Sequence, residues 1–417
     1  MARHSSITGV GFGGGPPGPR RRRACARMPG MDFQLTEQQE LIRKEVAALA
    51  RSFSLDYWLE KDRKAEYPTE FVKAFADNGW LGMIIPEEYG GSGLGVTEAT
   101  LMLHEVCAAG AGTTGASPIH FYLFPPMPVI KHGAEPLKRK YLPRIATGEI
   151  TMSFGVTEPN AGTDTSRIQT RAEKQGDRYV VDGRKVWNTN ARQATHILLL
   201  ARTALRDPAK PFAGMTLFFT EFDRSKITVR EIEKLGRAAV DSNEIFIDGL
   251  EVPEADVVGQ VGRGFYHLLD SLNPERIFTG IEAVGIGRAA LERGVQYAKE
   301  RVVFDRPIGQ NQAIAHPLAL AWAKLESAEL MCLKAAWLFD HGKPCGAEAN
   351  TAKLMAAEAG FEACDVALQT HGGYGYAKEF YVERLWREVR LYKIAPVSQQ
   401  MVLNYLSEHV LGLPKSY

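Results

Sequence analysis

Apolar residues recur at helical spacing in the first part of the chain, from Leu35 to about Gly148. Segments such as LTEQQELIRKEVAALARSF, TEATLMLHEVCAAG and EPLKRKYLPRIATG place them at every third or fourth position, which is the spacing of one face of an α-helix. PEEYGGSGLG interrupts the pattern, and its glycines and proline predict a loop. The pattern therefore predicts a helical first domain.

The spacing of apolar residues changes to two between about Glu149 and Val261. Short runs rich in β-branched and aromatic residues alternate here with Gly, Asp, Asn and Pro, which is typical of strands joined by turns. The runs are ITMSFGVTE, DRYVVDG, THILLLAR, MTLFFTEF, KITVREIE and NEIFIDGLEV. They predict a β-domain, either a small barrel or a sandwich.

Helical spacing returns at Gly262 in long segments such as LLDSLNPERIFTGIEAVGIGRAALERGVQYAKERV, where Pro274 is placed to start or kink a helix. The complete pattern predicts an α+β multidomain fold. Its parts are an N-terminal helical domain (31–148), a middle β-barrel or sandwich domain (149–261) and a C-terminal helical bundle (262–417).

The first thirty residues carry glycines, prolines and six arginines but no acidic residue. They lack helical periodicity, so we expect a disordered leader over residues 1–30. It is either an over-extended start before Met31 or a transit segment. We expect a cytoplasmic protein, or one of the mitochondrial matrix if the leader is a transit segment.

Composition narrows the function further. A chain of 417 residues with 45% hydrophobic residues can build a large core, and its net charge of +1 gives no field that favours nucleic acid or an anionic membrane. No apolar run reaches the roughly 18 residues of a membrane span. The five cysteines are far apart, so we expect reduced thiols and no metal site. A small-molecule enzyme is the favoured class.

Two stretches of the β-region carry candidate ligand contacts. In VTEPNAGTDTS (156–166), Gly162 permits close backbone approach, and several hydroxyls could surround a heterocycle or a phosphate. In KVWNTN (185–190), Trp187 could pack against a planar cofactor beside Thr189. A simple turn and a core tryptophan are the alternatives.

Two more candidates lie in the helical C-terminal part. RVVFDRPIGQNQAIAHPLA (301–319) places Arg301, Phe304 and Gln312 before a helix. QTHGGYGYAKEF (369–380) joins helices through a glycine-rich turn whose N–H groups could meet a diphosphate. Neither has Walker or GxGxxG spacing, and each could be a plain connection.

Taken together and in order, these stretches resemble the acyl-CoA dehydrogenase family. PEEYGGSGLG, FGVTEPNAGTD, KVWNTN, LEVPEADVVG, RPIGQNQAIAHPLA and QTHGGYGYAKEFYVER are each similar to a family signature, and the resemblance covers Met31 to the C-terminus. It implies FAD as cofactor, an acyl-CoA substrate, an electron-transfer flavoprotein as acceptor and a homotetramer.

The resemblance also implies which residues hold FAD. Val156, Thr157, Trp187 and Thr189 would contact the isoalloxazine and Thr163 the diphosphate side. The ADP half would be held from a neighbouring subunit by Arg301, Phe304, Gln312, Gln369, Gly372 and Gly373, with Ser398 and Gln400 on the adenine side.

The catalytic base is missing from its most common place. Family members desaturate an acyl-CoA thioester: a glutamate takes the α-proton while the β-carbon gives hydride to flavin N5, and many carry this glutamate in a segment like IYEGTSQ. This chain reads IAPVSQQ, with Pro396 at the glutamate's position. Proline is no base, and it also lacks the N–H that in the family polarises the thioester carbonyl.

Glu275 is the candidate replacement. Isovaleryl-CoA and long-chain acyl-CoA dehydrogenases are similar in carrying the base on the first long helix of the C-terminal domain, at the position of Glu275, and Arg276 is implied near the substrate. Two alternatives stay open: Glu275 could be an ordinary first-turn acid, and Glu282 is a rival carboxylate.

Loss of the usual base leaves two other functions open. The protein could keep the fold and the flavin with altered chemistry, as an oxidase, desulfinase or monooxygenase, or it could be a non-catalytic subunit of a hetero-oligomer. FYLFPPMPVI (121–130) supplies bulky residues that could shape an acyl pocket, but the sequence does not select an acyl chain.

Overall fold

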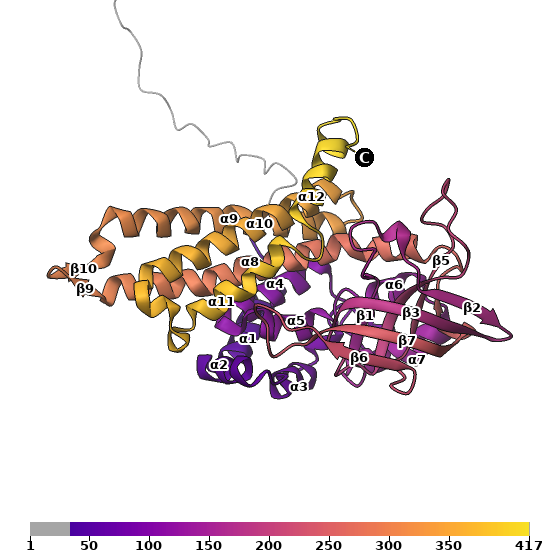
Figure 1. The fold of residues 1–417 in the computed structure, drawn as a ribbon. Coiled ribbons are helices and arrows are strands. Elements are labelled where there is room, and N and C mark those ends of the chain that lie inside the picture. The colour runs from indigo at the N-terminus through magenta and orange to yellow at the C-terminus, as the bar shows by residue number, and fades with distance from the viewer. Residues whose placement is uncertain (1–33, 417) are drawn as a thin grey trace, which may run out of the picture. The chain divides into compact units, whose positions relative to one another are not determined.

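The computed structural model describes residues 34–416. The predicted disordered leader over residues 1–30 lies outside the described residues. From Glu37 onward the chain forms one compact unit, with helices at both ends of the sequence and a sheet between them (Figure 1). This order of elements confirms the predicted fold class.

The first helical region packs around the buried aromatic residues Trp58, Phe71 and Phe75. The loop in PEEYGGSGLG follows a short 3-10 turn, Glu87–Tyr89. Gly91 is required in this loop because a Cβ there would lie 2.0 Å from the Ile85 carbonyl oxygen. The helices are α1 (Glu37–Arg51), α2 (Leu55–Lys64), α3 (Thr69–Asp77), α4 (Val96–Val106), α5 (Gly112–His120), α6 (Pro126–His132) and α7 (Glu135–Ala146).

The middle region is one sheet of eight strands. They are β1 (Met152–Gly155), β2 (Arg171–Gln175), β3 (Arg178–Thr189), β4 (His196–Arg202), β5 (Met215–Glu221), β6 (Ile227–Glu231), β7 (Ser242–Pro253) and β8 (Val257–Val258). Hydrogen bonds join them in the order β6-β7-β3-β2-β4-β5-β8, and β1 pairs with β4. Six strands match predicted runs. The pattern missed β2, which is mostly exposed and polar, and β8, which has two residues.

Alternation along β4 divides the apolar residues between two cores. Leu198 and Leu200 belong to the large core shared with the helices. Ile197 and Leu199 belong to a second core, inside the β-region, together with Val181 of β3 and other strand residues. One face of the sheet therefore packs on the helical core, and the other face encloses the second core.

The C-terminal helices are α8 (Gly264–Glu300), α9 (Gln312–Asp340), α10 (Gly346–His371), α11 (Val382–Val389) and α12 (Gln399–Tyr405). Between α8 and α9 lies a small hairpin of β9 (Val302–Val303) and β10 (Arg306–Pro307), at the far end of the long helices from the sheet (Figure 1). The expectation that Pro274 could start a helix is wrong, because α8 begins ten residues earlier and continues through it.

Small residues let α8 and α10 pack closely. A Cβ on Gly360 would lie 2.3 Å from the Ala283 carbonyl oxygen, and a Cβ on Gly287 would lie 3.0 Å from the Gly360 Cα. The small residues of GIEAVGIG are therefore a helix contact, and the larger side chains of the same helix remain available for a site.

The four cysteines in the described part of the chain are unpaired and buried: Cys107, Cys332, Cys345 and Cys364. Between residues 34 and 416, no helix combines the length and the apolar character that crossing a bilayer requires.

Candidate active site

Two buried carboxylates project from one helix, α8. Glu275 is 9% exposed and Glu282 is 2% exposed. They are seven residues apart, which is two helical turns or about 10 Å, so they lie on the same side of α8. Their hydrogen bonds distinguish their roles.

Glu282 is held on both oxygens. Oε1 lies 2.8 Å from Nδ1 of His120, the last residue of α5, and Oε2 accepts a hydrogen bond of 2.6 Å from the Tyr392 hydroxyl. Because its strong acceptor sites are engaged by buried partners, Glu282 joins three segments of the chain. This carboxylate is poorly suited to take a proton from a substrate.

Glu275 has a free carboxylate. Among the described residues, no hydrogen bond or ion pair engages its side-chain oxygens; its backbone carbonyl accepts from Thr279. Burial raises the pKa of Glu275 to about 7, against the opposing effect of the positive charges of His120 and Arg276. A buried carboxyl with a pKa near neutrality and no internal partner suits general-base chemistry.

The first-turn explanation for Glu275 is wrong. Glu275 lies in the interior of the 37-residue α8, where the helix N-terminus no longer acts on it. Arg276 does not form an ion pair with it. The Arg276 guanidinium instead donates to the Leu272 carbonyl oxygen (3.1 Å) and to Asn273 Oδ1 (3.2 Å), and burial lowers its pKa.

Pro396 is exposed and lies in the segment that leads into α12, after a cis peptide bond with Ala395. Ser398 is the N-cap of α12 and accepts from the Met401 N–H at 3.4 Å. Gln400 is exposed. This segment carries no carboxylate between Ala395 and Gln400, so Glu275 is the candidate base.

The predicted isoalloxazine contacts come together where β1 ends beside β3. The Val186 N–H donates to the Thr157 carbonyl at 2.9 Å, and buried Lys185 donates to the Val156 carbonyl at 3.1 Å. Ser153 Oγ donates to the carbonyl oxygen of Thr189. These bonds place Val156, Thr157 and Thr189 in one region.

Trp187 is turned away from the β-region core. The pairing of β3 with β7 shifts register between Lys185 and Asn188, and Trp187 at this bulge has φ 62° and is 59% exposed. The alternative of a core tryptophan is therefore wrong. An exposed indole beside hydroxyl-bearing residues fits a planar cofactor ring.

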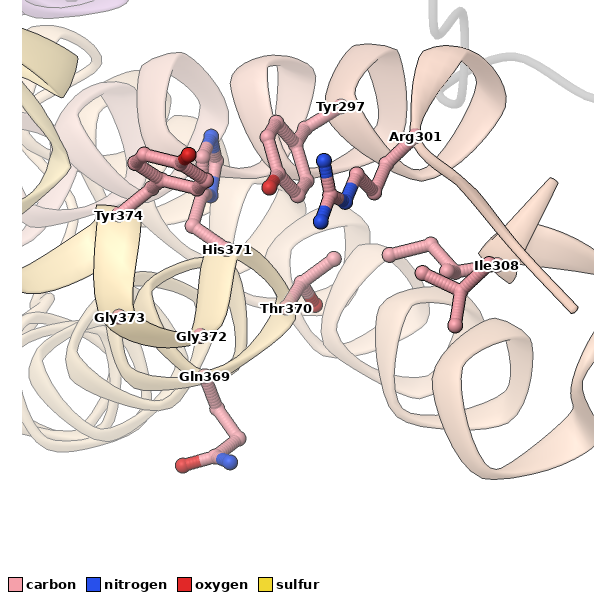
Figure 2. A pocket seen from close by; sticks show the side chains of 10 residues that line it. Tyr297, Arg301, Ile308, Gln369, Thr370, His371, Gly372, Gly373 and Tyr374 are labelled. Atoms are coloured by element: carbon pink, nitrogen blue, oxygen red, sulfur yellow. The ribbon is translucent and has the colours of Figure 1, made fainter.

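A second group surrounds a cavity of about 460 Å³ at the far ends of α8 and α10 (Figure 2). Arg301, Gln369, Gly372 and Gly373 line it. A Cβ added to Gly372 or to Gly373 would meet nothing within 4 Å, so the backbone is open to a ligand. A cation beside open backbone suits a diphosphate.

The remaining predicted contacts are exposed and separate. Phe304 is 92% exposed with φ 53° in the hairpin, Gln312 is exposed at the start of α9, and Thr163 is exposed in the loop after β1. The Trp187 group consists of Val156, Thr157, Trp187 and Thr189, and the Arg301 group consists of Arg301, Gln369, Gly372 and Gly373. Among the described residues, no hydrogen bond, ion pair or ring contact joins the two groups. The residues fit FAD as two separate half-sites.

The sequence pattern did not indicate three buried polar residues that lie around Glu282 on α8. They are His120, Tyr392 and Arg237, a buried guanidinium that donates to the hydroxyls of Ser117, Thr189 and Ser242. Their partners are 48 to 162 positions away in the sequence, Ser242 excepted. No local pattern could have indicated them.

Comparison with known proteins identifies the family. Models of the acyl-CoA dehydrogenase N-terminal, middle and C-terminal domains match residues 36–149, 153–250 and 262–411. The chain belongs to the acyl-CoA dehydrogenase family, the class of FAD-dependent enzymes that dehydrogenate acyl-CoA thioesters.

Individual relatives match over almost their whole length. Acyl-CoA dehydrogenase FadE12 of Mycobacterium tuberculosis is 37% identical over 94% of this chain and 100% of its own. A glutaryl-coenzyme A dehydrogenase in complex with glutaryl-CoA is 30% identical with a TM-score of 0.88, covering 93% of this chain and 98% of that one. A structure described as the electron transferring flavoprotein of Acidaminococcus fermentans is 32% identical with a TM-score of 0.87, covering 91% and 100%.

Proposed function

We propose that this protein converts an acyl-CoA to the trans-2-enoyl-CoA with Glu275 as the catalytic base. The observation that carries the proposal is the contrast on α8. Glu275 is buried, has no partner for its carboxylate and has a pKa near 7, whereas Glu282 is hydrogen-bonded on both oxygens. Only the first carboxylate is available to a substrate.

Glu275 removes a proton from the α-carbon of the thioester, and bound FAD supplies the acceptor for the hydride that leaves the β-carbon. Burial of Glu275 excludes water from the base and strengthens its attraction for the proton. Arg276 is held along α8 by its hydrogen bonds to Leu272 and Asn273, and it keeps a positive charge near the bound substrate. The absence of a backbone N–H at Pro396 means that another donor must polarise the thioester carbonyl.

We also propose a homotetramer in which FAD lies across two subunits. The Trp187 group belongs to the sheet, and the Arg301 group lies near the hairpin at the other end of the long helices (Figure 1). A helix of 37 residues such as α8 is about 55 Å long. Two half-sites at such separate places are best joined when a second subunit supplies one of them.

The proposed electron acceptor is an electron-transfer flavoprotein. Support comes from membership of the acyl-CoA dehydrogenase family. Oxygen would be the acceptor in the alternative chemistry suggested by Pro396, and rapid oxygen uptake without a mediator would identify that oxidase activity.

The base assignment is tested by two matched substitutions, Glu275→Gln and Glu282→Gln, assayed at pH 8.5 with a dye as acceptor. We expect Glu275→Gln to keep the bound flavin and thioester binding while turnover falls at least about a hundredfold, the lower end for loss of a general base. Glu282→Gln should keep most turnover per folded enzyme. Full turnover in Glu275→Gln, with loss in Glu282→Gln, would contradict the assignment.

A further inference from the structure

A buried chain of three polar side chains lies against the helix face that carries Glu275. It runs from the Tyr392 hydroxyl through the Glu282 carboxylate to Nδ1 of His120, with contacts of 2.6 and 2.8 Å. All three residues are at most 6% exposed. Such a chain costs free energy of desolvation, and its placement beside a base suggests a function in addition to folding.

The His120 ring contacts α8 on the same stripe as Glu275. Its centroid is 5.9 Å from that of Phe278, and its Nδ1 meets Glu282. Positions 275, 278 and 282 follow i, i+3, i+7 spacing and form one face of the helix. Because His120 Nδ1 contacts Glu282, Nε2 is the ring nitrogen that is available to other groups on this face of α8.

Contact with the Glu282 carboxylate favours the protonated form of His120. Burial alone would lower the pKa of His120, but the charge and hydrogen bond of Glu282 outweigh burial, and Glu275 adds to the rise. Arg237, in the loop before β7, opposes it. The Tyr392 pKa is raised far above its usual value by burial and by Glu282, so the hydroxyl keeps its proton.

We propose that His120, held by Glu282 and Tyr392, is a positioning residue whose charge keeps Glu275 ionised near neutral pH. The inference rests on the proposed role of Glu275 as base. Three charged groups act on Glu275: His120 of α5, and Arg276 and Glu282 of α8 itself. His120 exerts the largest of these charge effects and lowers the pKa of Glu275, so it outweighs Glu282, which raises it.

The test is the pH profile of kcat/KM for His120→Gln. Removing the cation should raise the pKa of Glu275, so the acidic limb should move upward by about one pH unit, the lower end for loss of a close opposite charge. Activity should fall about fivefold at pH 7 and recover near pH 9. An unmoved limb, or an equal loss at every pH, would overturn the proposal.

His196→Gln is the matched control. His196 is also buried, but its pKa is lowered to about 4, chiefly by burial, and it packs on Phe219 in the β-region. This substitution removes a ring without removing a charge, and we expect the acidic limb to stay in place. A shift of the limb in both variants would identify a general packing effect and overturn the proposal.

A second readout needs no turnover. The infrared band of the protonated Glu275 carboxyl, assigned by its loss in Glu275→Gln, should titrate near pH 7 in the holoenzyme and about one pH unit higher in His120→Gln. If His120→Gln does not fold, Glu282→Gln replaces it in the test. Loss of the Glu282 carboxylate favours release of the proton from His120, so the pH at which the Glu275 band titrates should rise by a smaller amount. If the wild-type enzyme dehydrogenates no acyl-CoA, the band still decides whether His120 acts on Glu275.

Discussion

Two glutamates on one helix face acquire different chemistry from their neighbours. On folding, the Glu282 carboxylate replaces its contacts with water by contacts with His120 and Tyr392. The Glu275 carboxylate leaves water for an apolar interior, where His120 and Arg276 lower its pKa without forming a hydrogen bond to it. Desolvation dominates for Glu275 and moves its pKa toward the working pH of a general base. Residue type alone therefore does not distinguish the proposed base, Glu275, from Glu282. The hydrogen bonds of the two carboxylates do.

The raised pKa of Glu275 predicts a dependence of stability on pH. Its folded-state value of about 7 exceeds the ordinary 4.5, so the folded protein loses stability as pH rises from about 4.5 through 7. Glu275→Gln removes this loss. We expect the variant to gain stability over the wild type between pH 5 and pH 8, by about 1.4 kcal/mol for each pH unit that separates the folded and unfolded pKa values.

The measurement is urea unfolding of both proteins at pH 5 and at pH 8. Glu282→Gln is the comparison, because it loses a charged acceptor for two buried donors and should be destabilised at both pH values. Equal pH dependence in Glu275→Gln and the wild type would show that the Glu275 carboxyl is not desolvated.

At the scale of elements, α11 fixes the start of α5. Glu388 of α11 accepts from the Thr113 N–H at 2.6 Å and from the hydroxyls of Thr113 and Thr114, and it pairs with fully buried Arg384 at 3.0 Å. A carboxylate at these free N–H groups also interacts favourably with the helix N-terminus. Since α5 ends at His120, this contact helps to position the histidine that faces α8.

Glu388→Ala should therefore destabilise the protein strongly. It leaves the Arg384 charge and the first N–H groups of α5 without their acceptor, and breaking a buried pair costs about 3–5 kcal/mol. Glu60→Ala is the control, because the Glu60–Lys64 pair is about 60% exposed on both sides and its loss should change stability little. Similar unfolding free energies for the two variants in urea would contradict this account.

At the scale of the whole molecule, the β9–β10 hairpin exposes apolar side chains. Val302 is 56% exposed, Val303 37% and Phe304 92%, beside the cavity that Arg301 lines. Exposed apolar residues next to an incomplete ligand site are typical of a surface that another subunit covers. The hairpin is therefore the expected contact for the second half of the cofactor site.

Light scattering should give four times the chain mass of 46.0 kDa. Phe304→Ser should weaken assembly and FAD retention together, because it removes the most exposed apolar side chain of the proposed contact. Leu205→Ser, at a position 96% exposed in the loop after β4, is the matched control and should leave both unchanged. A stable monomer that retains stoichiometric FAD would contradict the shared site.

The sequence predicted the fold from periodicity because long helices and buried strands repeat their pattern over many residues. It predicted Glu275 only through resemblance, since an acid in an apolar helix has no spacing that marks a base. Trp187 illustrates the limit: its exposure depends on a register shift between β3 and β7 that residue types do not encode. His120 and Tyr392 were missed because their contacts join positions more than a hundred residues apart.

The most direct test of the central claim is an anaerobic titration of the purified protein with a panel of acyl-CoA thioesters, following the visible absorbance of the flavin. We predict that at least one thioester bleaches the flavin in the wild-type protein, and that the same thioester binds to Glu275→Gln without bleaching it. A flavin that stays oxidised with every thioester in the wild type, or bleaches equally fast in Glu275→Gln, would contradict dehydrogenation by Glu275.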